Sequence, residues 1–518
     1  MRRPVPAVAL LLAAGVLAAG CTDGGAAPED PATAATTAPG TPSAPPATTP
    51  APPAPAPSPV TLRWQPCDDG FQCATLPVAV DPQERPGVTV ELAVTRRPAG
   101  DPARRAGSLV VNPGGPGSSA VEYLQRAWQA LPRAVRDRFD LVAFDPRGVG
   151  RSVPVKCLGT AEMDALVAID PDPDDDAELR ALQEGARRLA GACARTTGWL
   201  LPHVSTDAVA RDLDALRAAL GEAQLTYLGY SYGTSIGLEY LRQFPGRVRA
   251  MVLDSPLDPT LSWDRLLEGQ AGGFDRALGA FLDHCERAGC AFRAAVPRSR
   301  HADLGAAYDA LAARVDEAPL PADGPRRLGP AEFSLGVGAG LYSRASGWPA
   351  VAAGLAAAQR GDGSVLLALS DAYLDRTEDG YTGSSEANLA VNCTDRPWPR
   401  EPAPYLALAE RVRETAPRFG PAIALSGLGC AVWPEQADRA PAAVTAPQAP
   451  PVLVLATTRD PATPYAWARA LSAQLATDVL ISVEGDGHTV YRSSAGRCVR
   501  DRVTAYLVDL AVPAPTTC

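Results

Sequence analysis

Histidine is scarce in this 518-residue sequence, which limits where acid–base chemistry can occur. Only four are present: His203, His284, His301 and His488. Clustered positive charge is also lacking: the 48 basic residues, nearly all arginine, are scattered along the chain. The net charge of the chain is −10. A nucleic-acid partner is therefore not expected. The length and the 46% hydrophobic content allow one large core with an insertion.

Recognisable spacings of metal ligands and phosphate-binding glycines are missing as well. His284, Cys285 and Cys290 are a candidate set of zinc ligands, but their spacing matches no tetrahedral pattern. The glycine-rich run at residues 112–119 is followed by no Lys-Ser/Thr and lacks Gly-x-Gly-x-x-Gly spacing. We expect neither a metal nor another cofactor.

The pentapeptide Gly229-Tyr230-Ser231-Tyr232-Gly233 is the most informative motif that is present. Residues 225–228 predict a buried strand, and residues 234–243 predict a helix that ends before Pro245-Gly246. Ser231 would then lie on a sharp strand-to-helix turn that exposes its hydroxyl, as a nucleophile requires. Alone, the pentapeptide is equally compatible with a glycine-rich helix start.

A serine nucleophile needs a base and an acid that orients it, in the order Ser, acid, His. His488 follows the strand-like residues 478–483 and lies in a glycine-flanked turn, so we predict that it is the base. Asp460 follows the strand-like residues 451–456 and is our choice of acid. Asp254, at the end of the preceding predicted strand, is the rival acid.

Acyl transfer also needs N–H donors for the developing oxyanion. One is predicted to be the backbone N–H of Tyr232, directly after the nucleophile. The other should come from the glycine-rich loop that follows the predicted strand 108–111. Pro116 has no N–H, so Gly115 is the favoured second donor, with Gly114 close behind.

Asp145 and Arg147 also follow a predicted strand, at residues 141–144. Charged residues at such a position suggest catalysis. An Asp before Pro-Arg-Gly, however, more often ties down loop N–H groups, so we predict a structural role.

Several motifs together resemble those of actinobacterial secreted tripeptidyl aminopeptidases, which are related to prolyl aminopeptidases. They are Asn-Pro-Gly-Gly-Pro-Gly at 112–117, Asp-Pro-Arg-Gly-Val-Gly-Arg-Ser at 145–152, Gly-Tyr-Ser-Tyr-Gly at 229–233, Asp-Pro-Ala-Thr-Pro at 460–464 and Gly-His at 487–488. The resemblance covers residues 60 to 518 and implies an α/β-hydrolase fold, N-terminal exopeptidase chemistry and a helical cap. Prolyl aminopeptidases usually have His where Pro113 stands, which weakens any expectation of prolyl specificity.

The predicted fold class is α/β, with a mostly parallel doubly wound sheet and an inserted, mainly helical cap. The interval between Ser231 and Asp460 is far longer than one or two strand–helix units need, which indicates the insertion. The predicted divisions are 60–256 for the first part of the core, 257–440 for the cap, and 441–518 for the C-terminal part of the core that carries acid and base. Thr206 is predicted to cap a helix that ends at Gly221 and precedes the nucleophile strand.

The amino terminus reads as a targeting segment. Residues 1–20 predict a signal peptide, with Cys21 as the lipidated residue of a membrane lipoprotein. Ala18 stands where a lipobox usually has Leu, so ordinary secretion is the alternative. Residues 21–59, rich in Pro, Ala and Thr, predict an extended tether that holds the enzyme at the outer face of the cytoplasmic membrane.

Without Cys21, ten cysteines remain, an even number that suits five disulfides in an oxidising compartment. The sequence does not determine how they pair. Short closures would give Cys67–Cys73, Cys157–Cys193, Cys285–Cys290, Cys393–Cys430 and Cys498–Cys518.

The leading hypothesis is a serine exopeptidase that acts on peptides with free N-termini. Its cap should supply a carboxylate for the substrate ammonium, and Glu386 and Asp395 are the candidates, although either is more often a solvated loop charge. The alternatives are a cap-covered carboxylesterase with the same machinery and a non-catalytic envelope-binding lipoprotein.

Overall fold

The computed structural model describes residues 60–297, 303–437, 439–476, 478–492 and 496–518. The chain divides into two units, residues 1–57 and Ser58–Cys518, and every described residue belongs to the second. The predicted signal peptide, Cys21 and the tether therefore lie outside the described residues, as does His301. Within the described part of the chain, no helix is long and apolar enough to cross a membrane.

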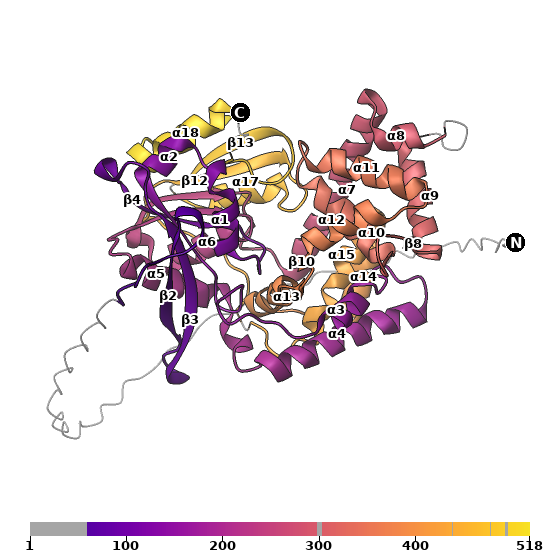
Figure 1. Ribbon diagram of the computed structural model, residues 1–518, viewed down its shortest axis with the longest axis horizontal. Coiled ribbons are helices and arrows are strands. Elements are labelled where there is room, and N and C mark those ends of the chain that lie inside the picture. The colour runs from indigo at the N-terminus through magenta and orange to yellow at the C-terminus, as the bar shows by residue number, and fades with distance from the viewer. Residues whose placement is uncertain (1–59, 298–302, 438, 477, 493–495) are drawn as a thin grey trace, which may run out of the picture. The chain divides into compact units, whose positions relative to one another are not determined.

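A ten-stranded mixed sheet forms the core of the second unit (Figure 1). Its strands are β1 (Gln65–Pro66), β2 (Gln72–Asp81), β3 (Arg85–Arg97), β4 (Gly107–Asn112), β5 (Phe139–Phe144), β6 (Leu225–Tyr230), β7 (Val248–Asp254), β12 (Val452–Arg459), β13 (Asp478–Asp486) and β14 (Thr516–Thr517). Their order is β1-β2-β3-β5-β4-β6-β7-β12-β13-β14. Pairing is antiparallel from β1 to β5 and parallel from β5 to β14.

The central strands are buried along their whole length, as expected when helices cover both faces of a parallel sheet. The covering helices are α1 (Ala120–Ala127), α2 (Arg133–Arg138), α5 (Thr206–Ala219), α6 (Gly233–Gln243), α17 (Tyr465–Gln474) and α18 (Arg497–Asp509). Side chains of α5, α6 and α17 belong to one hydrophobic cluster, and those of α1, α2 and α18 to another. The two clusters correspond to the two faces of a doubly wound sheet, which confirms the predicted fold class.

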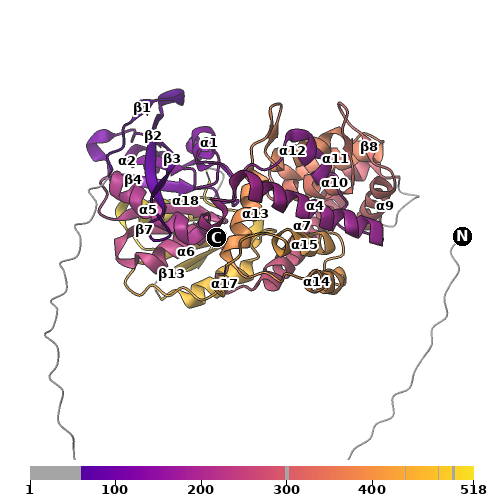
Figure 2. The ribbon, with the colours of Figure 1, turned by 90° about the horizontal axis from the view of Figure 1, so that it is seen from below.

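The chain between β7 and β12 is mainly helical. It contains α7 (Trp263–Ala288), α8 (Ala291–Ala295), α9 (Leu304–Glu317), α10 (Pro330–Leu341), α11 (Gly347–Gln359), α12 (Ser364–Tyr373), α13 (Ser384–Asp395), α14 (Ala403–Arg413), α15 (Gly420–Ser426) and α16 (Leu428–Ala431), with two short hairpins, β8 (Leu320–Pro321) with β9 (Arg327–Leu328) and β10 (Arg376–Thr377) with β11 (Gly380–Tyr381). Most of α7 to α12 packs around a hydrophobic cluster of its own. We call the chain between β7 and β12 the cap. Figures 1 and 2 show α13 between the sheet and the remaining cap helices.

A second helical excursion, between β5 and α5, lies along the cap and was not predicted. It contains α3 (Thr160–Val167) and α4 (Asp176–Thr197) (Figures 1 and 2). Asp164 accepts hydrogen bonds from Arg376 at 2.8 and 2.9 Å, and Asp172 forms an ion pair with Arg413 at 2.6 Å. These polar contacts join the excursion to the cap.

All five cysteine pairings that short closures would give are present as disulfides. Such bonds form and persist in oxidising environments, so they indicate an extracytoplasmic protein. The Cys285–Cys290 bond occupies two of the three ligands of the zinc alternative.

The predicted structural role of Asp145 agrees with its contacts. Its carboxylate accepts hydrogen bonds from the Ser119 hydroxyl at 2.7 Å, from Val121 N at 3.1 Å and from Arg151 N at 2.9 Å. Arg147 forms a buried ion pair with Asp212 at 2.7 Å. Asp145 therefore fixes the loop before α1, whereas Arg147 donates to Val80 O and His203 O and fixes the chain at the end of β2. Among the described residues, no hydrogen bond joins either side chain to Ser231.

The cap of α5 differs by one residue from the prediction. Ser205 caps the helix, with its side chain accepting the Ala208 N–H, and Thr206 is the first helical residue. The Thr206 hydroxyl has other partners, described below.

Candidate active site

Ser231 lies on the turn between β6 and α6, with a φ of 52°, in the left-handed region that residues other than glycine rarely adopt. The flanking glycines make this turn possible: a Cβ on Gly229 would lie 2.5 Å from Gly233 O, and one on Gly233 would lie 2.7 Å from Asn112 O. Ser231 N donates a hydrogen bond to Asp254 O of the neighbouring strand at 2.9 Å. The half-buried serine therefore has the strained backbone expected of a nucleophile elbow.

His488 and Asp460 meet at the same edge of the sheet. His488 Nδ1 lies 2.9 and 2.8 Å from the two carboxylate oxygens of Asp460, and the side chains are 6% and 0% exposed. Parallel pairing explains this, because Arg459 at the end of β12 is in register with Asp486 of β13. Asp460 Oδ1 also accepts the N–H groups of Ala462 and Thr463, so the loop fixes its carboxylate.

The serine and histidine segments converge on Asp254, at the end of β7. Asp254 O accepts the Ser231 N–H, while its carboxylate accepts those of Val490 at 2.9 Å and Tyr491 at 2.7 Å. His488 Nε2 is buried and has no hydrogen-bond partner among the described residues, so the serine hydroxyl is not bonded to it. Hydrogen bonds of this kind are often long before the substrate binds.

Asp254, the rival acid, holds the backbone after His488 rather than the imidazole. It is buried, and burial raises its pKa to about 6 despite the two N–H bonds to its carboxylate. Sequence reasoning missed this role. The signal available was its place at the end of a strand next to the nucleophile strand.

The glycine-rich loop of residues 112–119, which we call the oxyanion loop, lies directly against the turn that carries Ser231. A Cβ on Gly114 would be 2.9 Å from Ser231 Cβ and 3.0 Å from Tyr232 N. The Gly114 N–H already donates to Asn112 Oδ1 at 2.9 Å. Neither the Gly115 N–H nor the Tyr232 N–H donates a hydrogen bond to any described residue. These contacts favour Gly115 over Gly114.

Thr463 was not foreseen at the site. Its hydroxyl lies 3.4 Å from His488 Nδ1, beside the Asp460 carboxylate. Its position three residues after Asp460, in a loop stiffened by two prolines, was the only sequence signal.

Glu386 is fully buried on α13, a cap helix that contacts the oxyanion loop. Its Oε1 accepts the Cys157 N–H at 3.3 Å, whereas Oε2 is buried without a partner among the described residues, and burial raises the pKa of the carboxyl group. On the same helix, Asn388 Nδ2 donates to Pro116 O of the oxyanion loop at 3.0 Å. Glu386 therefore retains an oxygen for a further donor.

Asp395, the other predicted amine ligand, is engaged elsewhere. It accepts hydrogen bonds from Thr206 N at 2.7 Å and from the Thr206 hydroxyl at 2.5 Å, and that hydroxyl lies 2.6 Å from the hydroxyl of Tyr232. Burial raises the pKa of Asp395 to about 6. The carboxylate thus reaches the residue after the nucleophile through Thr206, and within the described part of the chain no hydrogen bond joins it to His488 or Asp460.

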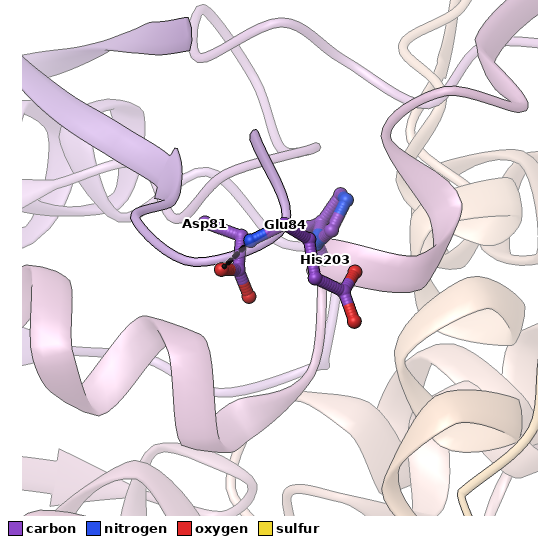
Figure 3. Close-up of side chains that lie close together, drawn as sticks. All are labelled: Asp81, Glu84 and His203. Atoms are coloured by element: carbon purple, nitrogen blue, oxygen red, sulfur yellow. Dashed lines mark hydrogen bonds between the residues drawn. The ribbon is translucent and has the colours of Figure 1, made fainter. Parts of the chain in front are cut away.

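A separate group of acids and an imidazole lies at the turn between β2 and β3. Asp81, Glu84 and His203 offer atoms within 4.8 Å of one another (Figure 3). One Asp81 oxygen already accepts the N–H groups of Gln83 and Glu84. None of the three cluster residues hydrogen-bonds to Ser231, Asp460 or His488 in the described chain. We assign no catalytic part to them.

Comparisons with known proteins identify the family of this chain. Residues 107–492 match the family described as alpha/beta hydrolase fold. The serine protease Hip1 of Mycobacterium tuberculosis is 38% identical over 473 residues, covering 87% of this chain and 89% of Hip1. Carboxylesterase B of the same organism is 37% identical over 459 residues (86% and 85%), and the tripeptidyl aminopeptidase of Streptomyces lividans is 32% identical over 468 residues (86% and 84%). The chain therefore belongs to the α/β-hydrolase family, as a serine hydrolase of the group that contains Hip1 and the Streptomyces tripeptidyl aminopeptidases.

Proposed function

We propose that the protein is a serine exopeptidase that releases short units, of tripeptide length, from the free N-termini of peptides. The observation that carries the serine chemistry of this proposal is the buried pair of His488 and Asp460 at the sheet edge where Ser231 occupies a strained turn, and the relatives named as peptidases support peptides as substrates. In the proposed reaction, Ser231 Oγ attacks the peptide carbonyl while His488 Nε2 takes its proton. His488 then returns the proton to the leaving amine, and water hydrolyses the acyl-enzyme.

The other residues have supporting parts in this mechanism. Asp460 accepts the Nδ1–H of His488, which keeps the tautomer whose Nε2 can act as a base, and it stabilises the imidazolium that forms. The free N–H groups of Tyr232 and Gly115 donate to the oxyanion, which carries its charge only in the tetrahedral species.

Recognition of the substrate amine is assigned to Glu386. Its free Oε2 is buried on a helix whose Asn388 contacts the oxyanion loop, and a buried carboxylate without a partner favours a cationic ligand. The relatives named as a tripeptidyl aminopeptidase and a protease support a peptide substrate. Asp395 remains the second candidate, although its contacts with Thr206 make it the weaker one.

A carboxylesterase is the second candidate function. One observation favours it: carboxylesterase B of Mycobacterium tuberculosis is 37% identical over most of the chain. The catalytic groups would be the same, and the difference lies in whether the cap recognises a substrate ammonium.

Hydrolysis of three matched substrates separates these functions: a tripeptide anilide with a free amine, its N-acetylated form, and a short acyl ester. The exopeptidase predicts cleavage of the free-amine anilide and a loss of at least about tenfold in kcat/KM on acetylation, because a charged hydrogen bond is removed. Equal rates with and without the acetyl group, together with fast ester hydrolysis, would favour the esterase. Ser231→Ala is the control for contaminating activity.

A fluorophosphonate probe tests whether the protein is an enzyme at all. The proposal predicts labelling of the wild-type protein and none of Ser231→Ala. No labelling of the folded wild-type protein would favour the non-catalytic lipoprotein.

The proposed location is the outer face of the cytoplasmic membrane, with Cys21 as the lipid attachment site and secretion as the alternative. Extraction of the full-length protein into a detergent phase, lost in Cys21→Ser, tests the anchor. Release of the unmodified protein into the medium would favour secretion.

A further inference from the structure

The backbone around His488 is held by a series of contacts, and one of them comes from the cap. The N–H groups of Thr489, Val490 and Tyr491 donate to Ser255 and Asp254, which belong to the core. The N–H of His488 itself donates to the carbonyl of Tyr342 at 2.9 Å. Tyr342 follows the last residue of α10, so the cap holds the backbone at the catalytic base itself.

The Tyr342 side chain also packs on the imidazole. The two rings are 5.2 Å apart between centroids, at an interplanar angle of 89°. Such an edge-to-face contact is a preferred arrangement of aromatic rings. Tyr342 therefore contacts His488 twice: its carbonyl accepts the backbone N–H, and its ring packs against the imidazole.

We infer that Tyr342 is a positioning residue for His488, and that through it the cap sets the orientation of the catalytic imidazole. The inference rests on the proposed function in taking His488 as the base. Asp460 fixes only the Nδ1 side of the ring, and Nε2 has no partner. The imidazole can still rotate and tilt about its Nδ1 hydrogen bond, and packing against the Tyr342 ring restricts this motion.

The residues after Tyr342 also contact the chain around His488 (residues 486–491), which we call the histidine loop. Ser343 forms an isolated β-bridge with Gly487, and Arg344 pairs with Asp486 at 3.1 Å. Gly487 has a φ of 118°, and a Cβ there would lie 3.1 Å from Tyr342 O. Close approach of the two segments thus depends on a glycine next to the base.

Tyr342 is itself held by aromatic residues of the cap. Its ring lies 5.7 Å from Phe274 and 6.1 Å from Tyr373, and Phe274 lies 5.6 Å from Phe419. These rings come from α7, α12 and the segment before α15. A substrate that displaces these cap elements would therefore move the Tyr342 ring against which His488 packs.

The test is the second-order rate constant for labelling of Ser231 by a small fluorophosphonate, which needs the activated serine and no recognition of a peptide amine. We expect Tyr342→Ala to label about 10- to 100-fold more slowly, because small misplacement of a catalytic group has effects of this size. Tyr342→Phe keeps the ring and should label at nearly the wild-type rate. Phe419→Ala is the control: it removes a ring from the same aromatic group without touching His488, and should leave the rate unchanged per folded molecule.

Thermal unfolding and circular dichroism give the folded fraction of each variant. Gly487→Ala adds a methyl group that would press on Tyr342 O from the other side of the same contact, so it should also slow labelling. The inference therefore stays testable if Tyr342→Ala does not fold. Wild-type rates in Tyr342→Ala or Gly487→Ala would overturn the inference, as would equal slowing in Phe419→Ala, which would point to general loosening of the cap.

Failure of this inference is distinguishable from failure of the proposed function. If wild-type protein is labelled and Tyr342→Ala is labelled equally fast, only the positioning role is wrong. If folded wild-type protein is not labelled, the serine chemistry and the positioning role are both wrong. The ratio of peptide to ester hydrolysis bears on neither labelling result.

Discussion

The core and the cap hold the histidine loop by different means. On the core side, the buried carboxylate of Asp254 accepts two consecutive N–H groups, and Asp460 binds the imidazole with an equally buried carboxylate. On the cap side, Tyr342 offers one carbonyl and one edge-to-face ring contact, and Arg344 offers an ion pair in which the arginine is 52% exposed. The core contacts are charged and hydrogen-bonded several times, so they fix where the loop lies. The cap contacts are fewer and weaker, which suits a role in adjusting the orientation of the imidazole.

Asp460→Asn should have the largest effect of the variants that test this comparison. An amide in place of the carboxylate removes the charge that stabilises the imidazolium and can present its NH₂ to Nδ1, which favours the wrong tautomer. We expect kcat/KM to fall by about 10⁴-fold, with the thermal unfolding midpoint little changed. A loss of less than about tenfold in the folded variant would show that another group, with Asp254 first in line, orients the base.

Asp254→Asn should affect stability first. One amide oxygen replaces a carboxylate that accepts two N–H groups, and the NH₂ group meets a donor, so the free energy of unfolding should fall by about 1–3 kcal/mol. Ser255→Ala removes only the single bond to Thr489 and is the matched, smaller change. Chemical denaturation at pH 4, where the difference between Asp254→Asn and wild type should be greatest, measures both. Equal stability of Asp254→Asn and wild type would contradict the core anchor.

The same variant has a pH signature. Burial raises the pKa of Asp254 from 3.8 to about 6 in the folded protein. Between those pH values the unfolded chain has already lost this proton while the folded chain keeps it, so rising pH lowers the stability of the wild-type protein on account of this group. Asparagine does not titrate. The stability difference between wild type and Asp254→Asn should therefore be greatest near pH 4 and smallest above pH 6.

The sequence predicted the core side of the site because each residue there is tied to a local pattern. Ser231, Asp460 and His488 each follow an apolar run that predicts a strand, and parallel strands bring their carboxyl ends to one edge. Tyr342 has no such signal: it follows a cap helix and reaches His488 only through tertiary packing. Nor could the excursion of α3 and α4 be predicted to lie along the cap, since contacts such as Asp164 with Arg376 join segments more than 200 residues apart.

Within the cap, the two predicted amine ligands differ in how many hydrogen-bond partners they have, as the core and cap contacts of the histidine loop do. Asp395 is bonded twice by Thr206, whereas Glu386 has an unpartnered oxygen. We expect Glu386→Gln to raise KM for free-amine tripeptide anilides about tenfold and to leave ester hydrolysis unchanged. Asp395→Asn should lower thermal stability and leave KM unchanged. The opposite pattern would assign the amine to Asp395.

Of these variants, Arg344→Ala should have the smallest effect on the labelling of Ser231. It measures how much the ion pair between the cap and Asp486 contributes to positioning the base. Its partner Asp486 is only 7% exposed but keeps a second pair with Arg459, at 2.6 Å, and the Arg344 side chain is 52% exposed. Exposed ion pairs are worth about 1 kcal/mol or less, so the fluorophosphonate labelling rate should change by less than about threefold. Raising the salt concentration should erase even that difference, because screening weakens an exposed pair. A tenfold loss in Arg344→Ala that persists at high salt would mean that the charge at Asp486, and not the ring of Tyr342, is the cap's main hold on the base.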